Sequence, residues 1–157
     1  MERTDLSRRP YVAVVGPGEA AAGELGAAEE VGSAIGAAGA VLVCGGLGGV
    51  MEAACRGARS AGGLTLGILP GHDRGAANPY VEVAVATGLG EARNALVVRA
   101  ADALVAVGGA YGTLSEIALA LKTGTPVVGF GTWEIEGIVC AETPLEAAES
   151  ALELARK

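Results

Sequence analysis

Hydrophobic positions along the chain fall into two alternating patterns. Continuous apolar runs of three to six residues are typical of strands buried on both faces. Such runs occur at Tyr11–Val15, Val41–Cys44, Leu64–Leu69, Val81–Ala86, Leu104–Val107, Pro126–Phe130 and Ile138–Cys140. Segments with helical periodicity or composition separate them, at Glu24–Ala38, Val50–Ala58, Gly88–Ala101, Leu114–Lys122 and from Pro144 onward. The alternation predicts an α/β fold, in which right-handed crossovers build a mostly parallel sheet of about six to seven strands with helices on both faces.

Three of the predicted strands end in glycine-rich turns, at Gly16–Gly18, Gly45–Gly49 and Gly108–Gly112. The carboxyl ends of parallel strands meet at one edge of the sheet, which is where such sheets bind ligands. Bare glycine backbone beside the free N–H groups of a helix start can cradle a phosphate. The chain has no GxxxxGK[ST] motif, and Gly16-Pro17-Gly18 lacks the third glycine of a dinucleotide fingerprint. The turns therefore predict a phosphate or nucleotide site outside the two commonest motifs.

Composition narrows the class of protein. A length of 157 residues suits one domain, and we expect a flexible lead over residues 1–9 and one nucleotide-binding domain over residues 10–157. Hydrophobic residues make up 51% and aromatic residues 3% of the chain, so the core must be built from small side chains. A net charge of −7 disfavours binding to nucleic acids and anionic membranes, and no apolar run long enough to span a membrane is present.

Candidate residues for metal, disulfide and Schiff-base chemistry are few. The three cysteines, Cys44, Cys55 and Cys140, form no CxxC pair, which favours a reduced cytoplasmic protein. His72 is the only histidine and has no partner at ligand spacing, so we expect no metal site and no cofactor. With only two lysines, Lys122 and Lys157, the chain does not fit a Schiff-base enzyme such as a pyridoxal-phosphate lysine decarboxylase.

Three segments carry a resemblance to a known family. GGLGGVMEAACRGA (45–58), EARN (91–94) and GGAYGTLSE (108–116) resemble the LOG-type phosphoribohydrolases, which are often mislabelled lysine decarboxylases. That family shares a modified Rossmann fold with molybdenum-cofactor carrier proteins and with the DNA-processing protein of bacterial transformation. The resemblance runs from Tyr11 to about Phe130, and it implies a homodimer or homotetramer.

The family signature, PGGxGTxxE with an upstream Arg-Lys pair, is matched in part. Gly108, Gly109 and Ala110 stand at its first three positions, and Asn94 follows Arg93 where the family has lysine. These departures resemble the carrier-like branch more than the cytokinin-activating enzymes. The resemblance implies catalytic roles for Arg93 and Glu116 and a ribose contact for Glu52. It also implies phosphate or nucleotide binding by Gly16, Gly45, Gly46, Gly108, Gly109, Tyr111, Gly112 and Thr113.

Each of these residues also has a structural interpretation. Thr113-x-x-Glu116 matches a capping box, in which Glu116 reaches back to the start of its helix. Arg93 fits a solvated helix surface, and Glu52 fits a partner of the helix dipole in a first turn.

The remaining candidates are equally ambiguous. Tyr111 and Trp133 suit either ligand stacking or packing. The loop around His72 suits either a lid or an ordinary surface loop, and Cys44 and Cys55 fit a buried core.

Two functions are consistent with these residues. The first is a protein that binds nucleoside 5′-monophosphates such as AMP and hydrolyses their N-glycosidic bond, where a carboxylate would stabilise positive charge on the ribose. The alternative is a non-catalytic carrier of molybdenum cofactor or a related phosphorylated pterin. Both predict a small phosphorylated ligand.

Overall fold

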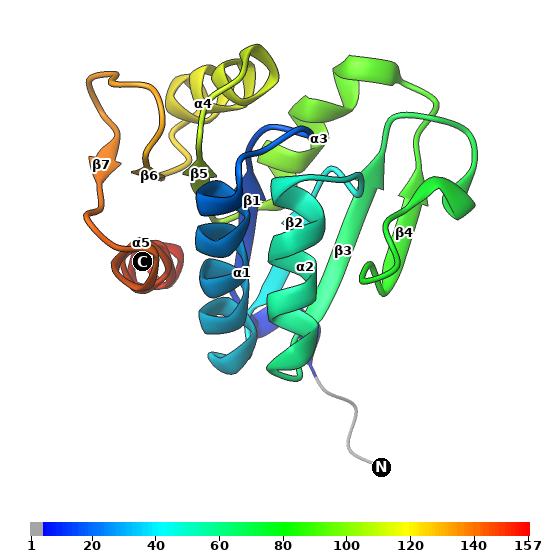
Figure 1. The fold of residues 1–157 in the computed structure, drawn as a ribbon, viewed down its shortest axis with the longest axis horizontal. Coiled ribbons are helices and arrows are strands. Elements are labelled where there is room, and N and C mark those ends of the chain that lie inside the picture. The colour runs from blue at the N-terminus through cyan, green and yellow to red at the C-terminus, as the bar shows by residue number, and fades with distance from the viewer. Residues whose placement is uncertain (1–4) are drawn as a thin grey trace.

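Seven parallel strands form one sheet in the computed structural model, which describes residues 5–157. The strands lie in the order β4-β3-β2-β1-β5-β6-β7, and every neighbouring pair is parallel (Figure 1). Their bounds are β1 Tyr11–Val15, β2 Val41–Cys44, β3 Leu64–Leu69, β4 Val83–Ala86, β5 Ala103–Val107, β6 Val127–Phe130 and β7 Val139–Cys140. The predicted α/β fold with a parallel sheet is confirmed.

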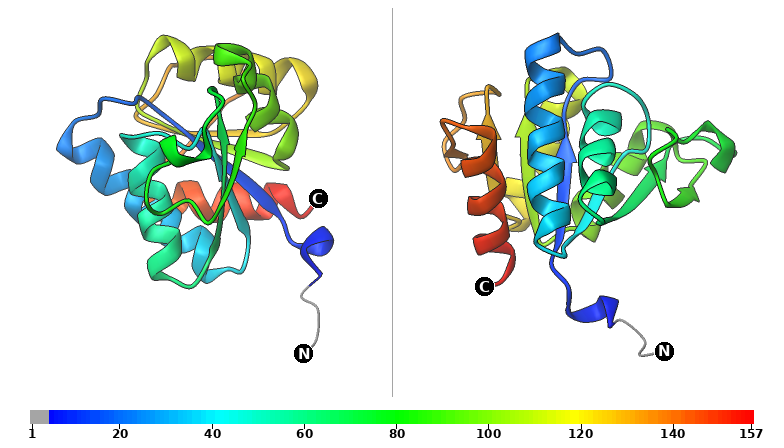
Figure 2. Two further views of the ribbon diagram at one scale, coloured as in Figure 1. Left: turned by 90° about the vertical axis from the view of Figure 1, so that its right-hand side faces the viewer. Right: turned by 60° about the horizontal axis from the view of Figure 1, so that its bottom comes forward.

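Helices cover both faces of this sheet (Figure 2). One face carries α1 Ala22–Ala37, α2 Val50–Ser60 and α5 Pro144–Ala155, and the other carries α3 Arg93–Ala100 and α4 Tyr111–Thr123. Alternate residues of each central strand point to opposite faces of the sheet and belong to two separate hydrophobic cores. Val12 and Val14 pack toward α1, whereas Ala13 and Val15 pack toward α3 and α4. Short 3-10 helices lie at η1 Leu6–Arg8, η2 Arg74–Ala76 and η3 Gly90–Ala92.

Glycines bring α1 and α2 into direct backbone contact. A β-carbon on Gly32 of α1 would overlap the carbonyl oxygen of Ala54 in α2, and one on Gly57 of α2 would overlap that of Glu29 in α1. The core is therefore filled by closely packed small residues and not by aromatic rings, as the low aromatic content predicts.

The predicted starts of the helices agree with the structure in some cases and differ in others. The last helix begins as predicted, because the Thr143 hydroxyl accepts the Glu146 N–H at 3.1 Å and Pro144 occupies the first helical position. Helix α4 begins at Tyr111, three residues before the predicted start at Leu114. The predicted helix 88–101 is divided into η3 and α3.

At the amino end, residues 1–4 of the predicted lead lie outside the described residues, and Leu6–Arg8 forms η1. Within residues 5–157, no helix has the length and apolarity needed to cross a bilayer.

Candidate functional site

The three glycine turns converge where the strand order reverses, between β1 and β5. A β-carbon on Gly16 would overlap the carbonyl oxygen of Val107, and one on Gly49 would overlap those of Pro17 and Gly18. The Val50 N–H also donates to Pro17 O at 3.1 Å. The turns after β1, β2 and β5 therefore touch one another at the upper edge of the sheet in Figure 1, which is the usual ligand-binding edge of this fold class.

The start of α4 has no side-chain cap. Its N-cap residue is Ala110, whose methyl group accepts no hydrogen bond, and Gly108 two residues earlier has a φ of 70° that only glycine adopts easily. Thr113 is the third residue of the helix rather than its cap, so the capping-box interpretation of Thr113 and Glu116 is wrong. The first N–H groups of α4 are thus available to an anion.

Thr113 presents an unusual hydroxyl. The residue is 2% exposed, and among the described residues its Oγ1 has no hydrogen-bond partner. A buried hydroxyl without a partner costs about 1–3 kcal/mol. The hydrogen-bonding capacity of this hydroxyl is therefore unused within the described residues.

Glu116 lies one turn further along α4 and is 8% exposed. Burial raises the pKa of its carboxyl group to about 7, while the positive charge of Arg93 acts in the opposite direction. No cation in the described part of the chain lies within ion-pair distance of this carboxyl group. Glu116 therefore exchanges its proton near neutral pH.

Arg93 lies across the carboxyl ends of two strands, so its interpretation as a solvated surface residue is wrong. Its Nε donates to Ile68 O at 2.9 Å, its Nη2 to Gly45 O at 3.4 Å, and its Nη1 to Asn94 Oδ1. A β-carbon on Gly45 would lie 2.7 Å from Nη2, so any other residue there would displace the guanidinium from this position. Carbonyl oxygens thus fix the guanidinium, and its charge still reaches Glu116.

Cys44 and Cys55 are buried, as the sequence indicated, but their direct contact was not predicted. Their sulfur atoms lie 3.4 Å apart, and the Gly46 N–H donates to Cys44 Sγ at 3.3 Å. The Cys55 thiol lowers the pKa of Cys44, and the same contact together with burial raises the pKa of Cys55. Cys44 is therefore the thiol of this pair that ionises first.

Glu24, in the first turn of α1, is a site residue that the sequence analysis missed. Its Oε1 accepts the Ala21 N–H at 3.0 Å, and a β-carbon on Gly108 would overlap its Oε2. A carboxylate thus lies against the backbone of the β5 turn. The only sequence signal for Glu24 was its place at the start of the predicted helix Glu24–Ala38, which indicates a partner of the helix dipole and not this contact.

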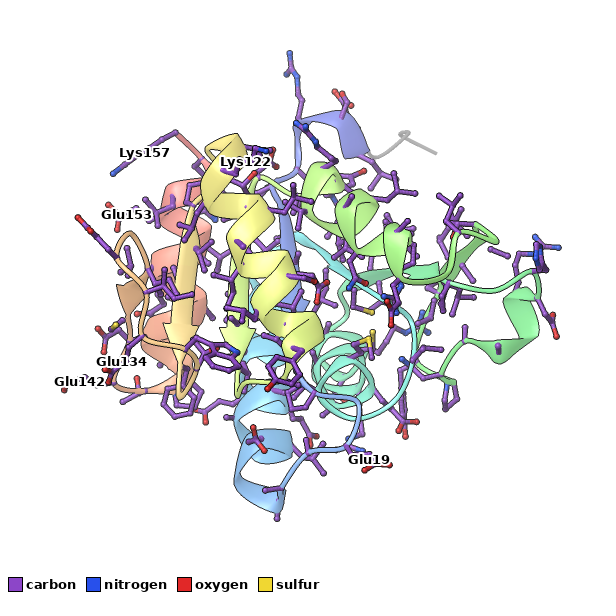
Figure 3. All side chains as sticks on the ribbon, turned by 90° about the horizontal axis from the view of Figure 1, so that it is seen from above. Glu19, Lys122, Glu134, Glu142, Glu153 and Lys157 are labelled. Carbon is purple, nitrogen blue, oxygen red and sulfur yellow. The ribbon has the colours of Figure 1, made fainter. Side chains whose placement is uncertain are left out.

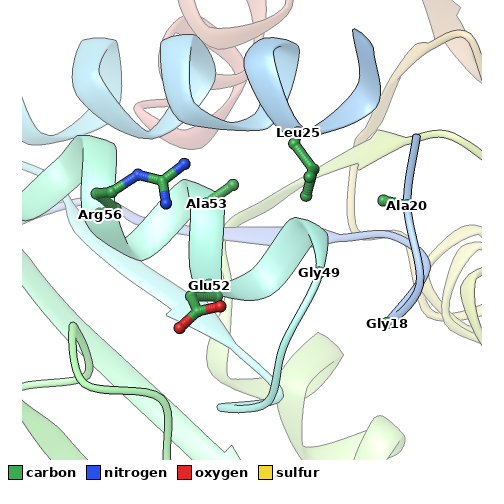
Figure 4. Close-up of a pocket in the computed structure, with 7 residues that line it drawn as sticks. All are labelled: Gly18, Ala20, Leu25, Gly49, Glu52, Ala53 and Arg56. Atoms are coloured by element: carbon green, nitrogen blue, oxygen red, sulfur yellow. The ribbon is translucent and has the colours of Figure 1, made fainter. Parts of the chain in front are cut away.

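Two hollows border the glycine turns. One, of about 250 Å³, lies between the β1 turn and α2 (Figure 4). Its lining residues are Gly18, Ala20, Leu25, Gly49, Glu52, Ala53 and Arg56. The other, of about 460 Å³, lies between η3, α3 and the start of α4, and is lined by Glu91, Ala92, Asn94, Tyr111, Gly112 and Ser115. The hollows share no lining residue, so Glu52 is not brought together with Tyr111 and Gly112.

The remaining candidate residues lie outside the contacts described above or at their border. Tyr111 is 84% exposed, and its ring faces that of Trp133 with centroids 6.3 Å apart. His72 lies in an exposed loop. Lys122 is in the last turn of α4, at the opposite end from the glycine turn, and Lys157 follows α5 (Figure 3). The described residues contain no cluster of three His, Cys, Asp or Glu side chains that could hold a metal ion.

Comparisons with known proteins agree with this fold. The family model described as SLOG cluster4 family matches residues 9–155. An uncharacterized protein of Archaeoglobus fulgidus is 46% identical over 137 residues, which cover 87% of this chain and 90% of that protein.

Two solved structures are similar over nearly their whole length. The molybdenum cofactor binding protein of Rippkaea orientalis is 38% identical with a TM-score of 0.87, over 91% of this chain and 95% of that one. The molybdenum cofactor carrier protein of Chlamydomonas reinhardtii is 36% identical with a TM-score of 0.84, over 96% and 100% of the two chains. The resemblance to the LOG-type and carrier-protein group is confirmed, and the chain belongs to the SLOG cluster4 family.

Proposed function

We propose that this protein binds and carries a phosphorylated pterin of the molybdenum-cofactor type without chemically changing it. The observation that carries the proposal is the buried, unpartnered hydroxyl of Thr113 at the uncapped start of α4. The similarity to a molybdenum cofactor binding protein and a molybdenum cofactor carrier protein supports the choice of ligand.

The phosphate of the ligand would bind at the first turn of α4. There, the free N–H groups of Tyr111 and Gly112 and the Thr113 hydroxyl can donate to phosphate oxygens, and the helix dipole favours the negative charge. The carboxylate of Glu24 lies against Gly108, so a phosphate placed directly on Gly108 would meet a like charge. The proposal therefore assigns the phosphate to Gly112 and Thr113 rather than to Gly108.

Glu116 and Arg93 would determine the net charge of this site. Because the pKa of Glu116 is about 7, its carboxyl group is protonated in a large share of molecules at neutral pH and can donate a hydrogen bond. Arg93 supplies a fixed positive charge from the ends of β2 and β3. An anionic ligand thus meets a site whose own charge is close to balanced.

Thermal unfolding tests this proposal. The probe is neopterin monophosphate, with AMP and inorganic phosphate for comparison. At one hundred times its dissociation constant, a ligand adds about 2.7 kcal/mol, which raises the melting temperature by roughly 5–10 °C in a chain of this size. We expect neopterin monophosphate to give this shift and AMP to give a smaller one.

Variants connect the shift to the site. Thr113→Val should abolish most of the ligand-induced shift while leaving the unliganded melting temperature unchanged or higher, since the lost hydroxyl has no partner. Thr123→Val is the matched control, because Thr123 Oγ1 bonds to Leu119 O at the far end of α4. Absence of any shift at millimolar ligand would refute the proposed function.

Hydrolysis of a nucleoside 5′-monophosphate is the second candidate function. The raised pKa of Glu116 favours it, because a carboxyl group that titrates near pH 7 suits general acid–base catalysis. Incubation with AMP and with N6-modified AMP should then release free base at a rate that Glu116→Gln abolishes. If no base is released and neopterin monophosphate still binds, the carrier function is favoured over hydrolysis.

We also propose that the protein is cytoplasmic, in line with its three unpaired cysteines, and that it forms a homodimer or homotetramer. A monomer mass by light scattering would refute the second statement. The net charge of −7 leads us to propose no nucleic-acid or membrane partner.

A further inference from the structure

Two of the five aromatic residues in the chain do not pack against the core. Tyr11, Tyr80 and Phe130 lie partly buried against the two hydrophobic clusters, whereas Tyr111 is 84% and Trp133 37% exposed. Both exposed rings lie at the start of α4. In a protein that fills its core with alanine, valine and glycine, this placement needs an explanation other than packing.

The two rings come from different elements and face each other. Tyr111 is the first residue of α4, and Trp133 lies in the loop after β6. Their centroids are 6.3 Å apart and their planes meet at 26°. The Trp133 indole N–H donates to Ala110 O at 3.3 Å, and a β-carbon on Gly109 would lie 3.1 Å from the indole nitrogen. The β5 turn itself therefore holds the indole in place.

The same turn leads directly to the proposed phosphate site. Tyr111 and Gly112 line the hollow of about 460 Å³, whose size falls within the range of small-molecule sites. Its other lining residues include the Asn94 amide and the Glu91 carboxylate, which are groups that pair with the N–H and carbonyl edges of a heterocycle. The Tyr111 ring, polar edge groups and a helix start thus border one hollow, while Trp133 lines a separate hollow.

We propose that Tyr111, backed by the indole of Trp133, binds the planar ring of the ligand by stacking, while Gly112 and Thr113 hold its phosphate. This inference rests on the proposed function, and it adds the residues that select a ring-bearing ligand over a simple sugar phosphate. Stacking on an aromatic side chain is worth enough to change affinity by about tenfold for each ring contact removed. The aromatic pair therefore determines specificity, and the start of α4 supplies affinity for the phosphate common to all candidate ligands.

Trp133 is the only tryptophan in the chain, so intrinsic fluorescence reports on the indole that backs Tyr111. Titration with neopterin monophosphate, corrected for ligand absorbance, should quench the emission. Ribose 5-phosphate has no ring, so it should bind without comparable quenching. Calorimetry should give a Kd for neopterin monophosphate about tenfold higher in Tyr111→Leu, close to the original value in Tyr111→Phe, and unchanged for ribose 5-phosphate in both variants.

Three other outcomes separate the inference from the function on which it rests. If neopterin monophosphate binds in a Thr113-dependent manner but Tyr111→Leu leaves its Kd unchanged, the stacking role is refuted and the carrier function stands. If Tyr111→Leu changes only the mass measured by light scattering, the rings form a contact between copies of the chain, and the inference is again refuted. If neither phosphate compound binds, the proposed function fails and the inference fails with it.

Discussion

Replacing Glu116 by glutamine tests the electrostatics of the site. Burial raises the pKa of this carboxyl group from 4.5 to about 7 in the folded protein. The folded state then binds more protons than the unfolded state between these two values, so stability falls as the pH rises from about 4.5 to 7. A shift of this size corresponds to about 3 kcal/mol. Glutamine keeps the shape and does not ionise, so Glu116→Gln should be about 3 kcal/mol more stable than the original protein above pH 8, relative to their difference at pH 4.

Urea unfolding at intervals from pH 4 to pH 8.5, followed by circular dichroism, measures this difference. With a slope of about 2 kcal/mol per molar urea, the two midpoints should separate by roughly 1.5 M over the pH range. Glu149→Gln is the control, because it removes one carboxyl group from an exposed position on α5. A difference for Glu116→Gln that varies with pH no more than that of the control would show that Glu116 is charged at neutral pH and is stabilised by contacts other than those described.

Four further substitutions follow from the contacts described above. Gly32→Ala should lower the free energy of unfolding by about 2 kcal/mol or more, because the added methyl group would overlap the backbone of α2. Gly18→Ala is the control, because a β-carbon there meets no atom within 4 Å, and it should change stability little. Urea unfolding measures both. Thr143→Ala removes the cap of α5 and should cost about 1 kcal/mol by thermal unfolding. Arg93→Met removes the charge that lowers the pKa of Glu116, so the midpoint of the pH effect should move upward, and an unmoved midpoint would contradict that coupling.

The parts of the fold that depend on local pattern could be predicted from the sequence. Apolar runs and turn residues were enough to indicate the strands and the parallel sheet, because both signals lie within a few residues. Thr143, Pro144 and Glu146 gave the start of α5 for the same reason. The start of α4 was not predictable in this way, because Ala110 is a poor cap and no local signal places it there.

The site depends on contacts between residues that are far apart in the sequence. Arg93 is fixed by the carbonyl oxygens of Gly45 and Ile68, and no pattern around Arg93 indicates this. Glu24 lies against Gly108 although 84 positions separate them. The glycine turns showed where a site would form, whereas the charges that govern its chemistry depend on how the elements pack.

The contact between α1 and α2 has a mechanical consequence. With Gly32 and Gly57 each against the backbone of the other helix, the two helices cannot slide or rotate past one another without a steric clash. The turns after β1 and β2, which lead into these helices, also contact each other through Gly49 and the carbonyl oxygens of Pro17 and Gly18. Hydrogen exchange on ligand binding should therefore change less in α1 and α2 than in α4, where the proposed phosphate site lies.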